Sequence, residues 1–454
     1  MQSPWPLTPG AMPRVASDAA ERLDEKPAYL TVAGVPLGRQ GSALVGLKDT
    51  GLDISLPDGL ALHYDREGRL TRAATPNIQW RRGLSHRTVW LRKRSGLEGG
   101  GLETRLLTPD LSDRIADETS VRAQEVLAAW QVRSRPLIKY EGEPARAAEL
   151  LDRRLSRAAA FDAQAARIDH ERFAAVYGDI PILPPDQYRA LVLLATGGCA
   201  YNRCTFCGFY RDSAFRRRTV DEFRTHASEA VAYHGQDAAV RRGIFLGQAN
   251  ALTGPRSWRK EILRVANEKW NLLASRDDLA KRRCVRETEI SSFIDAFTGR
   301  GMDADEFREL RSLNLRRLYL GVETGDPQLL EWLRKPATIA AMIETVHAAK
   351  QGGVSIGIIL LVGAGGEAHF ESHVRETAGM LRAMRLGKGD YVYLSPMTEA
   401  AGAEYSALAA EAGIEPLSAA RMAEQTSRLK AVFLDVPRNR RPYIAHYEVA
   451  QFVY

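Results

Sequence analysis

Cysteine is scarce in this chain. Its 454 residues include four cysteines, and three of them, Cys199, Cys204 and Cys207, lie within nine positions. So few cysteines exclude a secreted scaffold held by disulfides and indicate a reducing compartment. Long apolar runs are also missing, because "VSIGIILLVGAG" is far shorter than the roughly 20 residues that span a bilayer. The N-terminus lacks the pattern of a signal peptide, so we expect a cytoplasmic protein.

A strong charge excess is absent as well. The net charge of +7 is modest for this length, so it permits an acidic or phosphorylated partner without requiring nucleic acid. A hydrophobic content of 45% and a charged content of 26% are those of a globular protein. A chain this long is expected to form two or three domains.

Changes in residue pattern divide the chain into four predicted parts. An N-terminal arm and β-rich domain over 1–110 contains a hairpin predicted to turn at Glu67 and Gly68, and "GLEGGG" marks a flexible break near its end. A helical connector over 111–184 is rich in alanine, with apolar residues three and four positions apart. A core follows over 185–400, and 401–454 is expected to form a short C-terminal cap.

The core shows six short apolar runs, each followed by a helix-like segment. The runs cover residues 190–196, 243–248, 289–296, 316–324, 355–363 and 390–396. Repeated strand and helix segments predict a parallel sheet with right-handed crossovers. Six units rather than eight predict an α/β fold with a partial (β/α)6 TIM-like barrel. Such barrels place their chemistry on loops after the strands, and the three cysteines follow the first run.

The three clustered cysteines leave three interpretations open. Three thiolates can hold three irons of a [4Fe–4S] cluster and leave the fourth iron free for a small ligand. A structural zinc would need a fourth ligand, for which His226 or His234 is available, although the C-x4-C-x2-C spacing lacks the usual paired arrangement. Three unliganded thiols would more often be scattered through a core than gathered among polar residues.

The run "GCAYNRCTFCGFY" at the start of this pattern resembles the radical S-adenosylmethionine (SAM) superfamily. The likeness is to the subgroup that includes the oxygen-independent coproporphyrinogen oxidases and the Elongator-type tRNA-modifying enzymes, and it covers residues 185–400. The commonest family spacing is C-x3-C-x2-C; this chain has one more residue in the first gap, as some uncharacterised members do. The resemblance implies a [4Fe–4S] cluster held by Cys199, Cys204 and Cys207, with SAM on the open iron.

The resemblance also implies a set of SAM-binding residues. Phe206 matches the family's aromatic residue before the third cysteine, near the adenine. Glu323, in "GVETGD", resembles the polar ligand of the ribose or the amino group, and Ile359 and Gly363 match the adenine-binding segment.

After the second strand, the family often has Gly-Gly-Glu to receive the methionine amino group. This chain has Gly247 followed by Gln248, so Gln248 or Asn250 would have to replace the acidic residue. Cys284, the remaining cysteine, is a weak candidate for a catalytic hydrogen donor, because a lone cysteine is usually a small buried hydrophobe.

The activity implied by the resemblance is reductive cleavage of SAM to a 5′-deoxyadenosyl radical, which abstracts hydrogen from an unidentified substrate. The expected partners are a small-molecule or precursor substrate and an electron donor such as flavodoxin or ferredoxin. An RNA substrate is less favoured, and no membrane span is expected.

Two other functions stay open. One is a zinc-stabilised nucleic-acid-binding protein that uses the basic strip from Arg81 to Arg94, with Trp80 and Trp90 interleaved, although an arginine-rich hairpin gives the same pattern. The other is a SAM-binding homologue with little catalysis, since the Gly-Gly-Glu position is altered. Arginines after the cysteines can hold an anion but more often form a solvated face.

Overall fold

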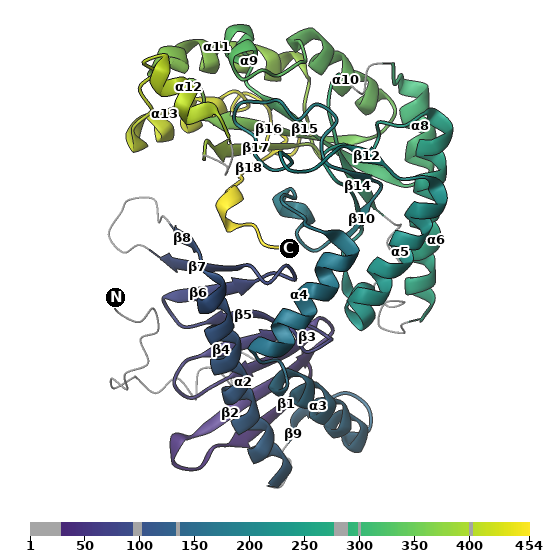
Figure 1. The fold of residues 1–454 in the computed structure, drawn as a ribbon, viewed down its shortest axis with the longest axis vertical. Helices are drawn as coiled ribbons and strands as arrows, with labels where there is room; N and C mark the ends of the chain where they lie inside the picture. The colour runs from purple at the N-terminus through teal and green to yellow at the C-terminus, as the bar shows by residue number, and fades with distance from the viewer. Residues whose placement is uncertain (1–28, 94–101, 133–136, 277–288, 298–300, 399–402) are drawn as a thin grey trace. The chain divides into compact units, whose positions relative to one another are not determined.

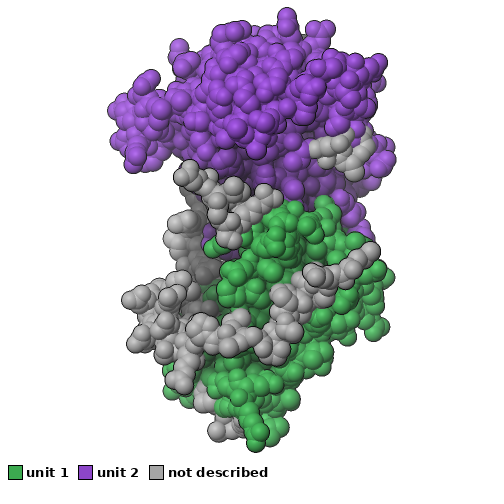
Figure 2. Space-filling view, turned by 90° about the vertical axis from the view of Figure 1, so that its left-hand side faces the viewer, with its two compact units in different colours: residues 1–173, 453 green, residues 174–452, 454 purple. Residues whose placement is uncertain are grey.

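A computed structural model of the chain describes residues 29–93, 102–132, 137–276, 289–297, 301–398 and 403–454 (Figure 1). The expected N-terminal arm and the "GLEGGG" break at 96–101 lie outside these residues. The chain divides into two compact units, which Figure 2 shows in different colours. Unit 1 comprises residues 1–173 and 453, and unit 2 comprises residues 174–452 and 454.

Unit 1 is built on an antiparallel sheet of nine strands in the order β8-β7-β6-β5-β4-β3-β2-β1-β9. Burial alternates along β4, where Leu62 and Tyr64 are buried, so one side of this strand faces a core. The strands are β1 (Tyr29–Pro36), β2 (Ser42–Lys48), β3 (Gly51–Ser55), β4 (Ala61–Tyr64), β5 (Leu70–Ala74), β6 (Ile78–Arg82), β7 (Thr88–Lys93), β8 (Leu102–Leu106) and β9 (Leu137–Tyr140).

Three helices lie across one face of this sheet (Figure 1): α2 (Pro109–Val132), α3 (Pro144–Ala159) and α4 (Ala163–Tyr177). Their apolar sides and the inner side of the sheet form one hydrophobic core. The helices predicted from the alanine-rich segments are therefore present. The predicted hairpin is also present, since β4 and β5 pair around a turn in which Gly68 has φ +85.

Unit 2 is built on a parallel sheet of seven strands in the order β10-β13-β14-β15-β16-β17-β18. All six predicted strands are confirmed. The strands are β10 (Leu191–Leu194), β13 (Ile244–Gly247), β14 (Ile290–Ile294), β15 (Leu315–Glu323), β16 (Ser355–Val362), β17 (Tyr391–Pro396) and β18 (Tyr443–His446). The seventh strand, β18, comes from the C-terminal region and pairs in parallel with β17.

Among the described residues β10 and β18 each pair with one neighbour only, so the sheet is open, as a partial barrel requires. Helices pack along it (Figure 1), and β16 is buried at seven of its eight positions, as expected of a strand covered on both sides. The helices are α5 (Val220–His234), α6 (Arg256–Arg276), α8 (Ala304–Ser312), α9 (Pro327–Trp332), α10 (Ile339–Gln351), α11 (Phe370–Ala383), α12 (Tyr405–Glu411) and α13 (Ala419–Ala431).

Candidate active site

The three cysteines lie on the loop between β10 and α5, at the carboxyl end of the first parallel strand. Two short strands, β11 (Thr196–Gly197) and β12 (Arg216–Arg217), pair antiparallel and close the base of this loop. Gly198 has φ +69, and a Cβ there would lie 3.0 Å from two carbonyl oxygens of residues 213 and 214. Only glycine fits this turn without strain, so the sequence "GGC" sets the path of the chain into Cys199.

Arg211 braces the cysteine loop from within. Its guanidinium donates to the carbonyl oxygens of Asn202 (2.7 Å), Cys204 (2.8 Å) and Cys207 (3.2 Å). Asn202 has φ +50, and its side chain donates to the carbonyl of Tyr210 at 2.6 Å. These bonds add to the backbone bonds of the loop, in which the N–H of Cys207 donates to the carbonyl of Cys204 at 3.2 Å. Arg211 therefore holds the loop, and its donors are occupied by this role.

The three thiols are half-buried, and the loop aims a donor at one of them. The backbone N–H of Asn202 lies 3.3 Å from Sγ of Cys199. Burial raises the pKa of the Cys207 thiol to about 11, and it raises the pKa of the Cys204 thiol as well. Metal ligation requires the thiolate, so loading this loop releases protons.

The donor set fits an iron–sulfur cluster better than a single ion. In the part of the chain that the structure describes, no three His, Cys, Asp or Glu side chains gather closely enough to hold one metal ion. A [4Fe–4S] cluster needs no such convergence, because each cysteine thiolate binds a different iron. Cys199, Cys204 and Cys207 are half-buried and lie at separate positions along one braced loop, which matches that requirement.

The two histidines considered as a fourth zinc ligand are bonded elsewhere. Both lie on α5 and are buried, with 3% of His226 and none of His234 exposed. Nε2 of His226 accepts from the backbone N–H of Leu194 at 2.9 Å, and Nε2 of His234 lies 3.2 Å from the Tyr177 hydroxyl. These bonds connect α5 to the first strand and to Tyr177, and among the described residues no group of three His, Cys, Asp or Glu side chains that could hold a metal ion includes either ring.

A buried ion pair lies beside the cysteine loop. Nζ of Lys335 donates to Oε1 of Glu323 at 2.8 Å, and only 12% and 7% of the two side chains are exposed. Burial alone would lower the pKa of Lys335, but the charges of Glu323 and Cys204 raise it above its ordinary value. A Cβ at Gly321 would lie 2.4 Å from Oε1 of Glu323, so glycine leaves the space that this pair occupies.

Two side chains proposed to replace the family's glutamate form bonds within the protein. Oε1 of Gln248 accepts from the N–H of Gly198 at 2.6 Å, and its Nε2 donates to the carbonyl of Asp179 at 2.9 Å. The amide of Asn250 donates to Asp295 at 2.7 Å. Gln248 therefore connects the end of β13 to the turn before Cys199. The Asp295 carboxylate, at the end of β14, is a further acidic group at this edge of the sheet.

Side chains of the C-terminal helices α12 and α13 accept hydrogen bonds from the glycine loop that follows β16. Gly363 has φ +91 and donates its N–H to Oε1 of Gln425, on α13, at 2.7 Å. Gly365 donates to the hydroxyl of Tyr405, on α12, at 2.8 Å. A Cβ at Gly363 would lie 2.5 Å from the Met422 sulfur, so this loop needs glycine for both conformation and space. Ile359 lies earlier on β16 and is 9% exposed.

Phe206 joins the cysteine loop to these same elements. Its ring packs against a small apolar cluster, and Nζ of Lys335 lies 6.0 Å from the ring centroid. The cluster comprises Leu329, Leu333, Leu361, Ala364, Tyr405 and Ala409. The side chain of Phe206 therefore anchors the cysteine loop to α9 and α12.

The tryptophans of the basic strip are not available to stack on bases. Trp80 is 2% exposed and Trp90 is 8% exposed, and both belong to the core of unit 1. Arg92 and Arg105 lie over the Trp90 ring, with their guanidinium carbons 5.3 Å and 5.5 Å from its centroid. The strip is therefore a hairpin with its aromatic side turned inward, apart from Arg94, which lies outside the described residues.

Sequence reasoning did not identify Lys335, Asp295 or Gln425 as residues of this region, and it considered Arg211 among arginines that hold an anion or, more often, form a solvated face. Lys335 follows Glu323 by twelve positions, and the short α9 between them returns the chain to β15. A lysine before proline at the end of a short helix carries no signal of its own. Cys284, the weak candidate for a hydrogen donor, lies outside the described residues.

An open parallel sheet with three thiols on the loop after its first strand defines the class: an α/β domain with a cysteine-rich loop at the carboxyl end of its sheet. Residues 193–378 match the family model of the Radical SAM superfamily, so the chain contains a radical SAM domain. A [4Fe–4S] cluster and SAM are the cofactors of this domain. No curated protein matches the chain.

Solved structures show weaker likenesses. The radical SAM methyltransferase TsrM from Kitasatospora setae has 16% identity and a TM-score of 0.33, over 46% of this chain and 37% of TsrM. Coproporphyrinogen III oxidase (HemN) from Escherichia coli has 13% identity and a TM-score of 0.37, over 57% of this chain and 55% of HemN. Methylornithine synthase (PylB) has 15% identity and a TM-score of 0.35, over 59% of this chain and 67% of PylB. The assignment rests on the family model.

Within the described residues, none of the helices is both long enough and apolar enough to cross a membrane.

Proposed function

We propose that this enzyme cleaves SAM reductively at a [4Fe–4S] cluster and abstracts a hydrogen atom from a small organic substrate. The observation that carries the proposal is the braced loop of three half-buried thiols, with a buried lysine–carboxylate pair beside it. When bound, the cluster and SAM together supply a carbon-centred radical able to attack an unactivated C–H bond, and the protein supplies binding, orientation and exclusion of water.

Each part of the chain has a role in this proposal. Cys199, Cys204 and Cys207 hold the cluster, and Arg211 keeps their loop in place. Lys335 offers a cation for a carboxylate, and Glu323 offers an acceptor for a ribose hydroxyl or an ammonium group; each is oriented by the other. Because an ammonium group is best matched by a carboxylate, we place the acidic contact to the methionine amino group at Asp295 or Glu323 rather than at the neutral Gln248.

We further propose that residues 185–400 form the catalytic core and that 401–454 close it. Support comes from α12 and α13, whose Tyr405 and Gln425 accept from the glycine loop after β16. The adenine would lie against this loop, near Ile359 and Gly363.

The test is anaerobic reconstitution with iron and sulfide, followed by reduction in the presence of SAM. We expect a brown protein with about four irons that releases 5′-deoxyadenosine. Cys204→Ala is expected to lose the cluster and the production of 5′-deoxyadenosine. Cys207→Ser keeps nearly the same side-chain volume but lacks the thiol, so a loss of the cluster in this variant reports on loss of the ligand rather than loss of volume. A colourless protein that keeps one zinc would refute the proposal.

A SAM-binding protein with little catalysis is a second candidate, because the altered Gly-Gly-Glu position places Gln248 in bonds to the protein. Binding of SAM to the reconstituted protein without release of 5′-deoxyadenosine, under dithionite reduction, would favour it. Release of stoichiometric or greater amounts of the nucleoside would exclude it.

A further inference from the structure

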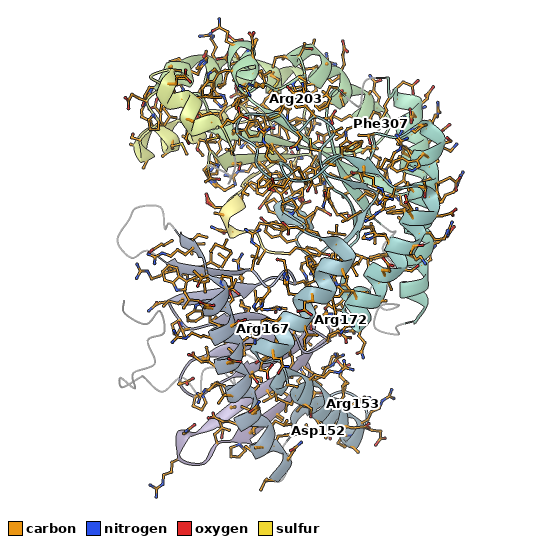
Figure 3. The ribbon with its side chains drawn as sticks, in the orientation of Figure 1. Asp152, Arg153, Arg167, Arg172, Arg203 and Phe307 are labelled. Atoms are coloured by element: carbon orange, nitrogen blue, oxygen red, sulfur yellow. The ribbon has the colours of Figure 1, made fainter. Side chains whose placement is uncertain are left out.

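A positively charged surface lies on the second half of the cysteine loop. Between residues 203 and 218 the chain has five arginines and a single acidic residue, Asp212. We call Phe215, Arg216 and Arg217, three consecutive residues at and just before β12, the arginine face. All three are exposed, and Phe215, at 39%, is one of the exposed large apolar side chains of the described residues. Arg203, which Figure 3 labels, is also exposed and lies in the first half of the same loop.

This face is held directly against the cysteine turn. Arg217 pairs with Thr196 and Arg216 pairs with Gly197 in the β11–β12 ribbon, so Arg216 lies opposite a residue two positions before Cys199. Gly198 packs on the carbonyls of residues 213 and 214. A partner seated on the arginine face therefore lies next to the loop that holds the cluster.

The positive charge of the face is only weakly neutralised. Arg216 pairs with Glu222, but the two side chains are 63% and 42% exposed, and exposed pairs of this kind contribute little. Arg217 lies over the Trp258 ring, with its guanidinium carbon 5.6 Å from the ring centroid, and among the described residues no acidic side chain pairs with it. Burial, and then the neighbouring charge of Arg216, lower the pKa of Arg218, as expected where positive charges accumulate.

An exposed aromatic side chain with a cationic rim is a common composition for a protein interface, in which Phe and Arg are enriched. Opposite charges steer such partners together and raise association rates by about 10- to 1000-fold at low salt. The face therefore suits a partner that is acidic around an apolar patch. RNA is also anionic, but a single exposed phenylalanine does not make the succession of stacking platforms that single strands use.

We propose that the arginine face is the docking surface of an acidic one-electron donor protein, which reduces the cofactor on the cysteine loop. This inference rests on the proposed function, which requires one electron for each SAM cleaved. The donor loses one electron and the cofactor gains it, and no bond forms or breaks in this transfer. The donor carries a flavin or an iron–sulfur centre near its own acidic surface.

The experiment compares a protein donor with a small reductant. Reconstituted enzyme is supplied with reduced flavodoxin, a small acidic flavoprotein, or with dithionite, and 5′-deoxyadenosine is measured. For R216E/R217E we expect a loss of about tenfold or more in the flavodoxin-driven rate at low salt, with the dithionite-driven rate within about twofold of the wild type. The flavodoxin-driven rate of R216Q/R217Q should lie between those of R216E/R217E and the wild type. The wild-type flavodoxin-driven rate should also fall with added salt.

The matched control is R375E, which reverses an arginine of similar exposure (69%) on α11 and should leave both rates unchanged. Binding of oxidised flavodoxin to each variant, measured by surface plasmon resonance, gives a readout that does not depend on turnover. Iron content and circular dichroism show whether each variant folds and loads.

Equal binding of flavodoxin by R216E/R217E and the wild type, or an equal loss in R375E, would overturn the proposal. So would a mixed-sequence single-stranded RNA that binds this face and displaces flavodoxin. If dithionite yields no 5′-deoxyadenosine with the wild type, the proposed function fails, while the binding comparison still decides the docking surface.

Discussion

Lys335 and Glu323 show how a few buried charges set the chemistry at the edge of the sheet. Two charges removed from water are tolerated because each is the partner of the other. Removing one of them leaves an uncompensated charge, whereas removing both does not. The pair therefore has a measurable energetic signature in the protein without its cofactors.

We predict that Lys335→Met lowers the free energy of unfolding by about 3 kcal/mol, since it leaves the Glu323 carboxylate buried alone. The double variant K335M/E323Q should be more stable than K335M. Denaturant unfolding of the cofactor-free protein measures both, and additive effects of the two substitutions would contradict the prediction.

His373 gives unit 2 a pH-dependent stability. Burial lowers the pKa of His373 from 6.5 to about 4; the charge of Asp326 raises it and that of His369 lowers it further. Because the folded pKa is the lower one, the unfolded chain binds more protons between these values. The contribution of His373 to the free energy of unfolding is therefore complete above the unfolded pKa and is lost as the pH falls toward 4.

We expect the wild type to be less stable at about pH 5 than at neutral pH, by about 2 kcal/mol from His373 alone. Burial lowers the pKa of His226 to about 3, so this residue adds to the effect with the same sign. His373→Asn should flatten the dependence, and denaturant midpoints across this range test it. An unchanged slope in the variant would assign the effect to other groups.

At the residue scale, the sequence predicts the cysteines as cluster ligands because three rare residues at close spacing have few explanations. Glu323 is predicted as a SAM ligand through its motif. Lys335 and Arg211 were not assigned their roles, because their contacts depend on where the chain returns after α9 and after the ribbon. Charged residues without a motif are usually solvated, and no local pattern distinguishes these two from the other arginines and lysines.

At the element scale, α13 controls the glycine loop after β16. The amide of Gln425 is fully buried and accepts the N–H of Gly363. Replacing it removes the acceptor and leaves a backbone donor without a partner, which costs about 1–3 kcal/mol.

We predict that Gln425→Leu raises the KM for SAM more than it lowers kcat, because the glycine loop loses its fixed position. Gln425→Glu keeps the acceptor oxygen and should retain more of the SAM affinity than the leucine variant. Equilibrium binding of S-adenosylhomocysteine gives a second measure. Equal KM values for the wild type and Q425L would show that the loop is held by other contacts.

The strands of unit 2 were predictable because continuous apolar runs bounded by turn residues are typical of buried parallel strands. β18 was not predicted. Its sequence, "YIAH", has four residues and exposed side chains at both ends, so it lacks the apolar run that marked the others. Pairing with β17 defines this strand, and pairing between distant segments leaves no local signal.

At the scale of the whole molecule, the chain divides into two compact units. Unit 1 is held partly by a buried charge network in which Arg69 contacts Asp65 at 3.3 Å and Asp169 at 2.8 Å. Arg82 lies 3.7 Å from the same Asp169. The network connects two hairpins to α4 and involves none of the residues assigned to the active site.

We predict that Arg69→Met destabilises unit 1 by about 3–5 kcal/mol, because two buried carboxylates lose a shared cation. Iron content after reconstitution should stay at the wild-type level, since the cysteine loop belongs to unit 2. Denaturation followed by circular dichroism, with parallel iron analysis, tests this separation. Loss of iron in proportion to loss of stability would show that the units depend on each other.

The brace formed by Arg211 has a consequence for the life of the enzyme in air. Its three bonds are to backbone oxygens, so they do not depend on the metal. We therefore expect the seat for the cluster to persist when oxygen destroys the cluster. We expect a protein damaged in this way to keep its fold and to accept a new cluster from the cell's iron–sulfur assembly machinery. Exposure to oxygen would then stop activity without requiring new synthesis of the chain.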